Sequence, residues 1–559
     1  MPEVLSLKKS NCKNCHKCIR NCPVKSIRFT GQQAHIISDE CILCGRCYVV
    51  CPHDAKEIMD STEQVRVLMQ SGRRVYASVS PAFVAAFEGS GINALAAALK
   101  KIGFAEVEET AVAATLVKRE YEKYVEKNGS NVIISSSCPS VNMLIERHYP
   151  NLCGYLAPVK SPMLVHALEI KRRDPEAAVV FIGPCIAAKE EAKNSPVDAV
   201  LTFAELDLML RQAKVKVERV MDENSHSRAR LFPTVGGIIC CMNKPLNGYT
   251  YLAVDGADDC RAALDDISNG VIGKCFVELS ACEGSCIGGP VMEKYSNFPV
   301  RHYQRAVCYA GNEDFDVETP AENEFYENYL PREVRKPMPP EDEIRRILKT
   351  IGKNTVEDEL NCGTCGYDTC RDKAIAIYRG AADYSMCLPF INDRSQKFTN
   401  SILDNSPNGL VVINDSFEIQ RINRTAMEMM NITYQADVLG ENIIRILDPT
   451  PFYQVYESGK TVKNRRAYFS DYKKYFEQTI VRDRESNTLM CIIRDVTEEE
   501  EANRKKEEMG HKTAEIADRV VEKQMRIVQE IASLLGETTA ETKIALTKLK
   551  ESIESDENK

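Results

Sequence analysis

Short apolar runs alternate with amphipathic stretches between residues 72 and 320, which is the pattern of a layered α/β domain. Strands are predicted at Val75–Val79, Val132–Ser136, Ala178–Ile182 and Cys275–Leu279. A helix with an alanine-rich packing face is predicted over Ile92–Lys101. Ligands in such sheets gather beyond the carboxyl ends of the strands. The residues that directly follow the predicted strands are therefore the first candidates for a functional site.

Cysteines occupy those positions. Cys138 follows the second predicted strand, Cys185 follows the third after Gly183-Pro184, and Cys282 and Cys286 follow the fourth. Thiolates are metal ligands, and four of them suit an iron–sulfur cluster. We therefore expect four cysteines that are far apart in the sequence to converge at one edge of the fold.

The first 62 residues contain the run C-x2-C-x2-C-x3-C-P twice, which predicts a two-cluster ferredoxin-like module. Three closely spaced thiolates reach three corners of one cubane, and the fourth cysteine of each run serves the other cluster. One 4Fe-4S cluster is thus assigned to Cys12, Cys15, Cys18 and Cys51, and the second to Cys41, Cys44, Cys47 and Cys22. A pair of zinc knuckles is the alternative, and the regular doubled run disfavours it.

Residues 321–355 are predicted to be a linker that ends in a helix opened by Pro339-Pro340. Residues 356–392 then resemble the small single-cluster domain of several redox proteins. Their four cysteines would hold a further 4Fe-4S cluster, and zinc remains an alternative because four thiolates also suit that metal. These cysteines are Cys362, Cys365, Cys370 and Cys387.

Residues 398–497 lack the cysteine pattern and resemble a PAS domain, a sensor fold. The segment contains no histidine, which argues against a histidine-ligated haem. We expect a dimerising relay without a cofactor, with Cys491 in the core.

Residues 498–559 are predicted to be helical. Ala517, Val521, Gln524, Val528, Ile531 and Leu535 alternate spacings of four and three, which indicates a coiled-coil seam. Gly536 is predicted to end this helix, and Thr538 to Glu541 form a capping box for a second one. The seam favours a homodimer or a docked partner, and packing on the PAS domain is the alternative.

Composition places the chain among cytoplasmic proteins. It has 559 residues, 44% of them hydrophobic, and no apolar run that would span a membrane. Its 23 cysteines in tight spacings favour metal ligation in a reducing compartment over disulfides. The net charge of −9 argues against nucleic acid as a partner.

Three motifs of the α/β region resemble the active-site motifs of FeFe hydrogenases. They are Ile134-Ser-Ser-Ser-Cys138-Pro139, Gly183-Pro184-Cys185-x3-Lys189-x-Glu191 and Glu278-x-Ser280-x-Cys282-x3-Cys286-x-Gly288-Gly289. The resemblance implies a two-lobed α/β domain with an H-cluster, in which Cys138, Cys185, Cys282 and Cys286 hold a cubane. It further implies that Cys286 bridges to a di-iron subcluster. Ser80-Pro81 and Gly183-Pro184 would line the cofactor pocket.

This chain departs from the family pattern at several positions. Ser137 stands where prototypical members have a proton-relaying cysteine, and a hydroxyl ionises far less readily than a thiol. Gly183 and Ser280 stand where methionine is usual, so we expect a looser and more polar pocket. Ala188 and Lys189 replace a pair of lysines. We assign Ser137, Lys189, Ser280 and Cys286 to the catalytic set.

The order of domains resembles that of sensory FeFe hydrogenases. The expected function is slow oxidation of dihydrogen, with the redox signal relayed through iron–sulfur clusters to the PAS domain. Expected partners are dihydrogen and protons, a redox protein such as ferredoxin, and a kinase or phosphatase. Two alternatives remain: a metabolic hydrogenase working with ferredoxin, and a non-catalytic hydrogenase-like iron–sulfur protein.

Overall fold

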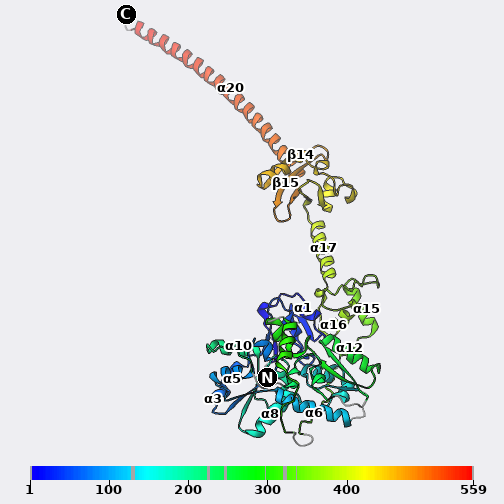
Figure 1. The fold of residues 1–559 in the computed structure, drawn as a ribbon. Helices are drawn as coiled ribbons and strands as arrows, with labels where there is room; N and C mark the ends of the chain where they lie inside the picture. The colour runs from blue at the N-terminus through cyan, green and yellow to red at the C-terminus, as the bar shows by residue number, and fades with distance from the viewer. Residues whose placement is uncertain are drawn as a thin grey trace. The chain divides into compact units, whose positions relative to one another are not determined.

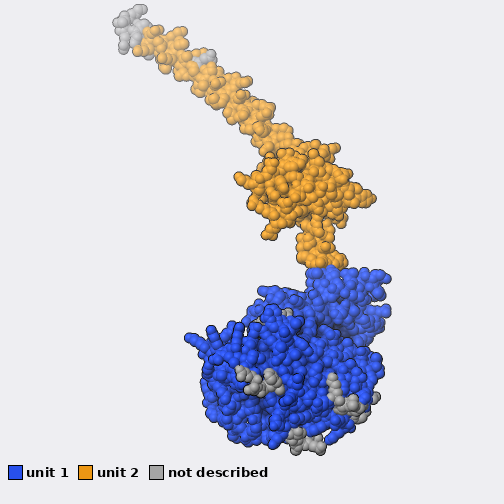
Figure 2. All heavy atoms as spheres, viewed as in Figure 1, with its two compact units in different colours: residues 1–391 blue, residues 392–559 orange. Residues whose placement is uncertain are grey.

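The computed structural model describes residues 3–127, 132–222, 227–243, 248–295, 298–318, 324–334 and 336–556. The chain divides into two compact units, residues 1–391 and residues 392–559 (Figure 2). Figure 1 gives the element labels used below.

The N-terminal module consists of two small antiparallel sheets and two short helices. β1 (Leu5–Leu7) pairs with β4 (Lys56–Ile58), and β2 (Ile27–Thr30) pairs with β3 (Gln33–Ile36). Helices α1 (Lys17–Arg20) and α2 (Arg46–Val49) each contain the third cysteine of one run. The short elements leave most of each cysteine run in loops, where successive thiols are free to turn toward a common point.

Two parallel sheets form the central domain, residues 62–309. The first has the order β6-β5-β8-β9, with β5 (Val75–Val79), β6 (Glu106–Glu109), β8 (Ala178–Gly183) and β9 (Ala199–Thr202). The second has the order β10-β11-β7, with β7 (Val132–Ile134), β10 (Thr250–Asp255) and β11 (Cys275–Ser280). Two sheets correspond to the two lobes expected from the sequence.

Helices separate and cover these strands. They are α3 (Thr62–Gln70), α4 (Phe83–Ala86), α5 (Ile92–Lys101), α6 (Ala111–Lys127), α7 (Pro139–His148), α8 (Pro162–Arg173), α9 (Ala188–Glu191), α10 (Phe203–Gln212), α11 (Gly237–Cys241), α12 (Ala257–Ser268), α13 (Pro290–Tyr295) and α14 (Pro299–Tyr309). Short 3-10 helices include η3 (Arg228–Leu231) and η4 (Ser285–Gly288).

The predicted elements of this domain are confirmed. β5 and α5 have the predicted bounds, and β8 and β11 each extend the predicted strand by one residue. β7 ends at Ile134, yet Ser135 continues the ladder by donating its N–H to the carbonyl of Val277 at 2.9 Å. Every residue of β5, β8 and β11 is buried, as expected for parallel strands covered on both faces.

The segment after the central domain is helical. α15 (Glu341–Thr350) follows Pro340, and α16 (Cys370–Tyr378) packs against it in a small separate core that includes Ile344, Ile347 and Ala374. α16 begins at Cys370, where the side chain of Thr369 caps it by accepting the N–H of Asp372. α17 (Leu388–Asp404) begins directly after Cys387.

The second unit contains an antiparallel sheet of order β13-β12-β16-β15-β14. Its strands are β12 (Gly409–Ile413), β13 (Ile419–Ile422), β14 (Val462–Phe469), β15 (Lys474–Asp483) and β16 (Thr488–Asp495). Helices α18 (Arg424–Met429) and α19 (Thr450–Ser458) contribute to the apolar core with these strands. Cys491 lies in this core, as predicted.

The predicted break at Gly536 is wrong. A single helix, α20, spans Thr497–Asp556. Thr538 does not cap a second helix, because its hydroxyl donates to the carbonyl of Leu534 at 2.6 Å, one turn earlier in the same helix. A glycine inside a helix costs only about 1 kcal/mol, which the strong helix formers around Gly536 offset.

In the part of the chain that the structure describes, no helix is both long and apolar enough to cross a bilayer.

Candidate metal centre and its cavity

A cavity of about 130 Å³ lies where loops of both sheets meet. Its wall includes Ser80 and Pro81 after β5, Ser137 and Cys138 after β7, Pro184 and Cys185 after β8, Ser280 at the end of β11, and Cys282 and Cys286 after it. Apolar atoms form most of its surface. The strand ends thus bring together nearly all the residues that the sequence analysis assigned to the active site.

The four scattered cysteines converge at this cavity. All four thiols line it, although their strands belong to two different sheets. Burial, together with the nearby Cys138, raises the pKa of Cys286 to about 12. Burial likewise raises the pKa of Cys282, with added contributions from Cys185 and Cys138. Four buried thiols around one cavity are the donor set that a cubane requires.

A cubane and a single ion make different demands on their ligands. Among the described residues, no three His, Cys, Asp or Glu side chains are arranged around one metal-ion position. In a 4Fe-4S cluster each cysteine binds a different iron, so the four sulfurs stand further apart than around one ion. Metal binding would displace the thiol protons that burial retains. The donor set therefore suits a cluster, with one cysteine for each iron.

Ser137 is held by a buried tyrosine. Its hydroxyl lies 2.9 Å from the hydroxyl of Tyr121, which also contacts the hydroxyl of Ser136 at 3.1 Å and accepts the N–H of Ser136 at 3.0 Å. Tyr121 is fully buried on α6, and burial raises its pKa. The position that a thiol occupies in prototypical hydrogenases thus carries a hydroxyl tied into a neutral hydrogen-bonded group.

Two carboxylic acids line the cavity. Burial raises the pKa of Glu278 to about 7, although its carboxylate accepts the N–H of Ile239 at 3.0 Å. Burial also raises the pKa of Glu191 to about 8. Both residues belong to the recognised motifs, but the sequence analysis gave them no role. Their environment, which decides their protonation, could not be read from the sequence.

A phenylalanine occupies the space beside Gly183. A Cβ on Gly183 would lie 2.8 Å from the ring of Phe181 and 3.3 Å from the Cβ of Ser80. Phe181 lines the cavity. We expected a looser pocket where Gly183 replaces the usual methionine. The structure does not show it at Gly183, because the ring of Phe181 fills the space. No sequence signal pointed to Phe181, since it lies inside a uniformly apolar strand.

Lys189 does not line the cavity. Its ammonium donates to the hydroxyl of Ser61 at 2.7 Å, to the carbonyl of Val200 at 3.0 Å and to the carboxylate of Glu205 at 2.9 Å. Ala188 lines the cavity instead. The catalytic role expected for Lys189 is thereby corrected: it ties α9 to α10 and to the start of α3.

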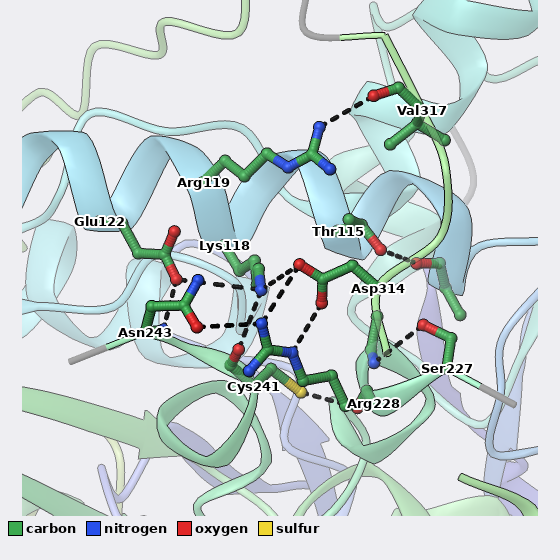
Figure 3. A network of polar contacts seen from close by, with 12 residues as sticks. Thr115, Lys118, Arg119, Glu122, Ser227, Arg228, Cys241, Asn243, Asp314 and Val317 are labelled. Atoms are coloured by element: carbon green, nitrogen blue, oxygen red, sulfur yellow. Dashed lines mark hydrogen bonds and ion pairs between the residues drawn. The ribbon is translucent and has the colours of Figure 1, made fainter. Parts of the chain in front are cut away.

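A network of charges around the buried Lys118 supports the helix that carries Tyr121; Figure 3 shows the network. The ammonium of Lys118, on α6, contacts Asp314 at 2.6 Å and the carbonyl of Cys241 at 3.1 Å. Arg228 donates to the same carboxylate at 2.7 Å. Lys118 is fully buried, so this network fixes α6 against η3 and α11. It thereby holds Ala114 and Tyr121 in place beside the cavity.

The ferredoxin-like module groups its cysteines in two crossed sets. Burial raises the pKa of Cys18 to about 11, and Cys15, Cys12 and Cys51 add to the shift. Burial raises the pKa of Cys44 to about 12, with contributions from Cys22 and Cys41. Cys22 and Cys41 also act on Cys47. The last cysteine of each run thus lies with the other run, as the sequence assignment requires.

The second of these sets adjoins the cavity. Cys44 is among the residues that raise the pKa of Cys282, and a small pocket is lined by both residues. A cluster on Cys44 would therefore be a direct neighbour of one on Cys282.

The third set lies around a buried lysine. Burial lowers the pKa of Lys373, while the thiols of Cys387, Cys365 and Cys370 oppose that shift. Cys362 is among the residues that act on Cys365. Lys373 is 1% exposed and donates to the carbonyl of Tyr384 at 3.3 Å. The four cysteines assigned to the single-cluster segment thus share one neighbourhood with a cation.

Four family models match the chain. Residues 73–290 match the iron-only hydrogenase large subunit, C-terminal domain, and residues 5–66 match a 4Fe-4S dicluster domain. Residues 358–389 match a putative Fe-S cluster model, and residues 397–466 match a PAS domain.

Curated relatives cover only part of the chain. The NADP-reducing hydrogenase subunit HndD of Solidesulfovibrio fructosivorans is 25% identical over 324 residues, which are 44% of this chain and 55% of the relative. Iron hydrogenase 1 of Clostridium pasteurianum is 22% identical over 343 residues, which are 49% of this chain and 60% of the relative. The chain thus spans little more than half the length of these two relatives.

Solved structures of low identity also match. The [FeFe]-hydrogenase HydA(ΔEFG) aligns with 49% of this chain and 100% of its own at 16% identity and a TM-score of 0.40. A PAS domain of an HTR-like protein from Haloarcula marismortui aligns with 19% of this chain and 94% of its own at 18% identity and a TM-score of 0.16.

The matched families and the grouped cysteines define the chain as an iron–sulfur protein with a ferredoxin-like dicluster module and a PAS domain. Between them, residues 73–290 form a domain of the type described as iron-only hydrogenase large subunit, C-terminal domain.

Proposed function

We propose that this protein is a sensory FeFe hydrogenase, which binds dihydrogen, oxidises it slowly to two protons and two electrons, and passes the redox signal toward its PAS domain. The observation that carries the proposal is Ser137. It lines the cavity where prototypical members carry a thiol, and its hydroxyl is engaged with Tyr121. A neutral hydroxyl exchanges protons far more slowly than a thiol at neutral pH, so turnover is limited.

The cofactor assignment follows the donor sets. Cys138, Cys185, Cys282 and Cys286 would hold the cubane of an H-cluster, whose di-iron subcluster supplies the chemistry that splits dihydrogen. The protein contributes an apolar cavity, in which Ser80, Pro81, Pro184 and Ser280 shape the space around that group. The dicluster module would hold two 4Fe-4S clusters and the single-cluster segment one more.

The remaining domains suit signal output. α17 begins at the residue after Cys387, a proposed cluster ligand, and leads into the PAS sheet that starts at Gly409. A redox change at Cys387 would therefore act on the first residue of a helix that enters the sensor domain. We assign a kinase or phosphatase as the downstream partner, a ferredoxin as redox partner, a homodimer formed through α20, and the cytoplasm as location.

A metabolic hydrogenase is the first rival, and Ser137→Cys separates it from the sensory assignment. In matured protein, restoring the thiol should raise dihydrogen turnover at least about tenfold, because positioned proton transfer contributes factors of roughly 10² to 10⁴. Ser136→Cys is the matched control, since this neighbour hydrogen-bonds to the same tyrosine but does not line the cavity. Unmodified protein that already turns over like a prototypical hydrogenase would refute the sensory function.

The second rival is a non-catalytic iron–sulfur protein. It is supported by Lys189, whose side chain points away from the cavity. With Lys189 bonded to Glu205 and Ala188 in the wall, these positions offer the cavity no lysine for the cyanide ligands of a di-iron subcluster. Infrared spectra of matured protein decide this point. Carbonyl and cyanide bands that disappear in Cys286→Ala support the hydrogenase assignment, and their absence from the unmodified protein contradicts it.

A further inference from the structure

A second cavity, of about 580 Å³, lies within the first unit and away from the cysteine-lined site. Three parts of the chain build its wall: Lys25 and Arg28 of the ferredoxin-like module, Tyr149 and Arg261 of the central domain, and Tyr367 and Arg379 of the single-cluster segment. Ligand pockets occur preferentially between domains and range from about 300 to 1,000 Å³. The cavity is therefore of the size and position of a binding site for a small organic molecule.

Its wall is positively charged, although the whole chain carries a net charge of −9. Five cationic side chains line it: Lys25, Arg28, Arg261, Lys336 and Arg379. Three carboxylates also line it, namely Glu40, Asp368 and Asp372. Lys25 pairs with Asp368 at 3.7 Å, and Lys336 pairs with Glu40 at 2.9 Å.

The three guanidinium groups have no carboxylate partner among the described residues. Arg261 donates to the carbonyl of Pro23 at 2.6 Å, and Arg379 donates to the carbonyl of Pro337 at 3.0 Å. Arg28 is exposed, and no hydrogen bond or ion pair holds it in the described part of the chain. Carbonyl oxygens do not neutralise a guanidinium charge. Three arginines thus share a cavity with only one carboxylate that lacks a cation partner, Asp372.

An apolar and aromatic surface accompanies these charges. Ile37, Met338 and Ile375 line the cavity together with Tyr149 and Tyr367. Tyr367 is 4% exposed, and its buried hydroxyl has no hydrogen-bond partner among the described residues. That hydroxyl is closed off from solvent, so Tyr367 offers the cavity its aromatic ring.

We propose that this cavity binds a small organic phosphate, of nucleotide size, between the ferredoxin-like module, the central domain and the single-cluster segment. Guanidinium groups recognise phosphate through paired N–H donors, and Arg28, Arg261 and Arg379 supply them from three different segments. The apolar and aromatic wall takes the organic part of the ligand. Because the ligand contacts all three segments, its binding fastens the single-cluster segment to the rest of the unit. This assignment is independent of the hydrogenase reaction.

Isothermal titration of the full chain with its iron–sulfur clusters tests the site, with ADP and inorganic pyrophosphate as probes. We expect one ADP per chain with a dissociation constant of about 1 mM or tighter, and weaker binding of pyrophosphate because it lacks the organic part. Added sodium chloride should weaken both interactions, since salt screens the charges. No saturable binding of ADP, or equal affinity for the two probes, would overturn the assignment.

Arg28→Glu is the variant of choice, because Arg28 is exposed and its side chain makes no hydrogen bond or ion pair with the described residues. ADP affinity should fall at least about tenfold, since a charge-assisted hydrogen bond is lost and a repulsive charge is gained. Arg28→Ala should give a smaller loss in the same direction. Arg211→Glu, at an exposed surface pair with Asp207 that does not line the cavity, is the matched control and should bind normally. Unchanged ADP binding by Arg28→Glu contradicts the proposal.

Discussion

The hydrogenase-type domain and the PAS domain bury polar groups in opposite ways. The first encloses complete ion pairs: Arg230 with Glu109, Lys118 with Asp314, and Lys189 with Glu205. The described PAS residues place their ion pairs at the surface, and even the well-connected Arg466 keeps a 40% exposed side chain. The core of the PAS domain is formed by apolar side chains.

The buried pairs flank the cavity. Glu109 precedes the cavity residue Thr110, and Arg230 is two residues before Phe232. Lys189 adjoins Ala188, and Lys118 shares α6 with Ala114. Loops around a cavity cannot be fixed by close apolar packing alone, because one side of each loop has no neighbour. Buried ion pairs with complete hydrogen bonds supply the missing geometric restraint. They fix the positions of the loops more than they add to the net stability of the domain.

The largest effect should come from breaking the deepest pair. Glu109→Ala removes the carboxylate that accepts two hydrogen bonds from Arg230, a side chain that is 1% exposed, and should destabilise the hydrogenase-type domain by about 3–5 kcal/mol. The loss of stability can be measured by denaturant titration, with hydrogen exchange of the peptides around β6 as the readout. Glu106→Ala on the same strand is the control: its pair with Lys100 is exposed, so the loss should be at most about 1 kcal/mol. Equal losses would contradict the contrast between buried and exposed pairs.

The stability of the PAS domain should depend on the apolar volume of its core and not on buried charges. Leu489→Ala, at a fully buried position of β16, should destabilise the PAS domain by about 2–4 kcal/mol through a cavity in its core. Met490→Ala is the matched control, since the neighbouring side chain points outward with 39% exposure. Hydrogen exchange should report the loss in residues 409–495. A comparable loss of protection at β5 or β8 would mean that the two domains do not respond separately.

A loss of stability between pH 5 and pH 7 should appear in the domain that encloses carboxylic acids. Burial raises the folded-state pKa of Glu278 to about 7, so the folded domain holds this proton more tightly than the unfolded chain does. Its stabilising effect is complete at acidic pH and is lost as pH rises, by about 2 kcal/mol between pH 5 and pH 7. Glu278→Gln should remove this part of the pH dependence in urea titrations. A variant with the full slope of the unmodified protein would show that another group causes it.

The sequence predicted the regular elements better than it predicted side-chain directions. Val75–Val79 and Ile92–Lys101 could be bounded because burial on both faces and helical periodicity are local patterns. The grouping of Cys51 with Cys18 followed from the spacing of the doubled run. Lys189 could not be placed, because adjacent residues of a short helix point about 100° apart and only the tertiary partner decides which one faces the cavity.

Two further features were beyond sequence reasoning for the same physical cause. Tyr121 reaches Ser137 from a different element, and Phe181 shares one face of β8 with Gly183, but only the packing of whole strands and helices decides that both contacts border the cavity. The misplaced helix end at Gly536 has a different origin. Glycine marks a helix end only where the chain turns into the left-handed region, and here strong helix formers on both sides continue the helix.

The smallest expected effect concerns a buried polar side chain in the otherwise apolar PAS core. Gln478, on β15, is fully buried, and neither atom of its amide has a hydrogen-bond partner among the described residues. An apolar residue of similar volume avoids the cost of burying these groups, so Gln478→Leu should stabilise the PAS domain by about 1 kcal/mol. Gln435→Leu is the control: this partly buried amide donates to the carbonyl of Ile422 at 3.2 Å, and its loss should destabilise slightly. Thermal unfolding of the two variants gives opposite signs if the PAS core tolerates polarity only where it is paired. Destabilisation by Gln478→Leu would instead mean that a bound group satisfies the amide, and the PAS domain would then resemble the hydrogenase-type domain in enclosing a polar site.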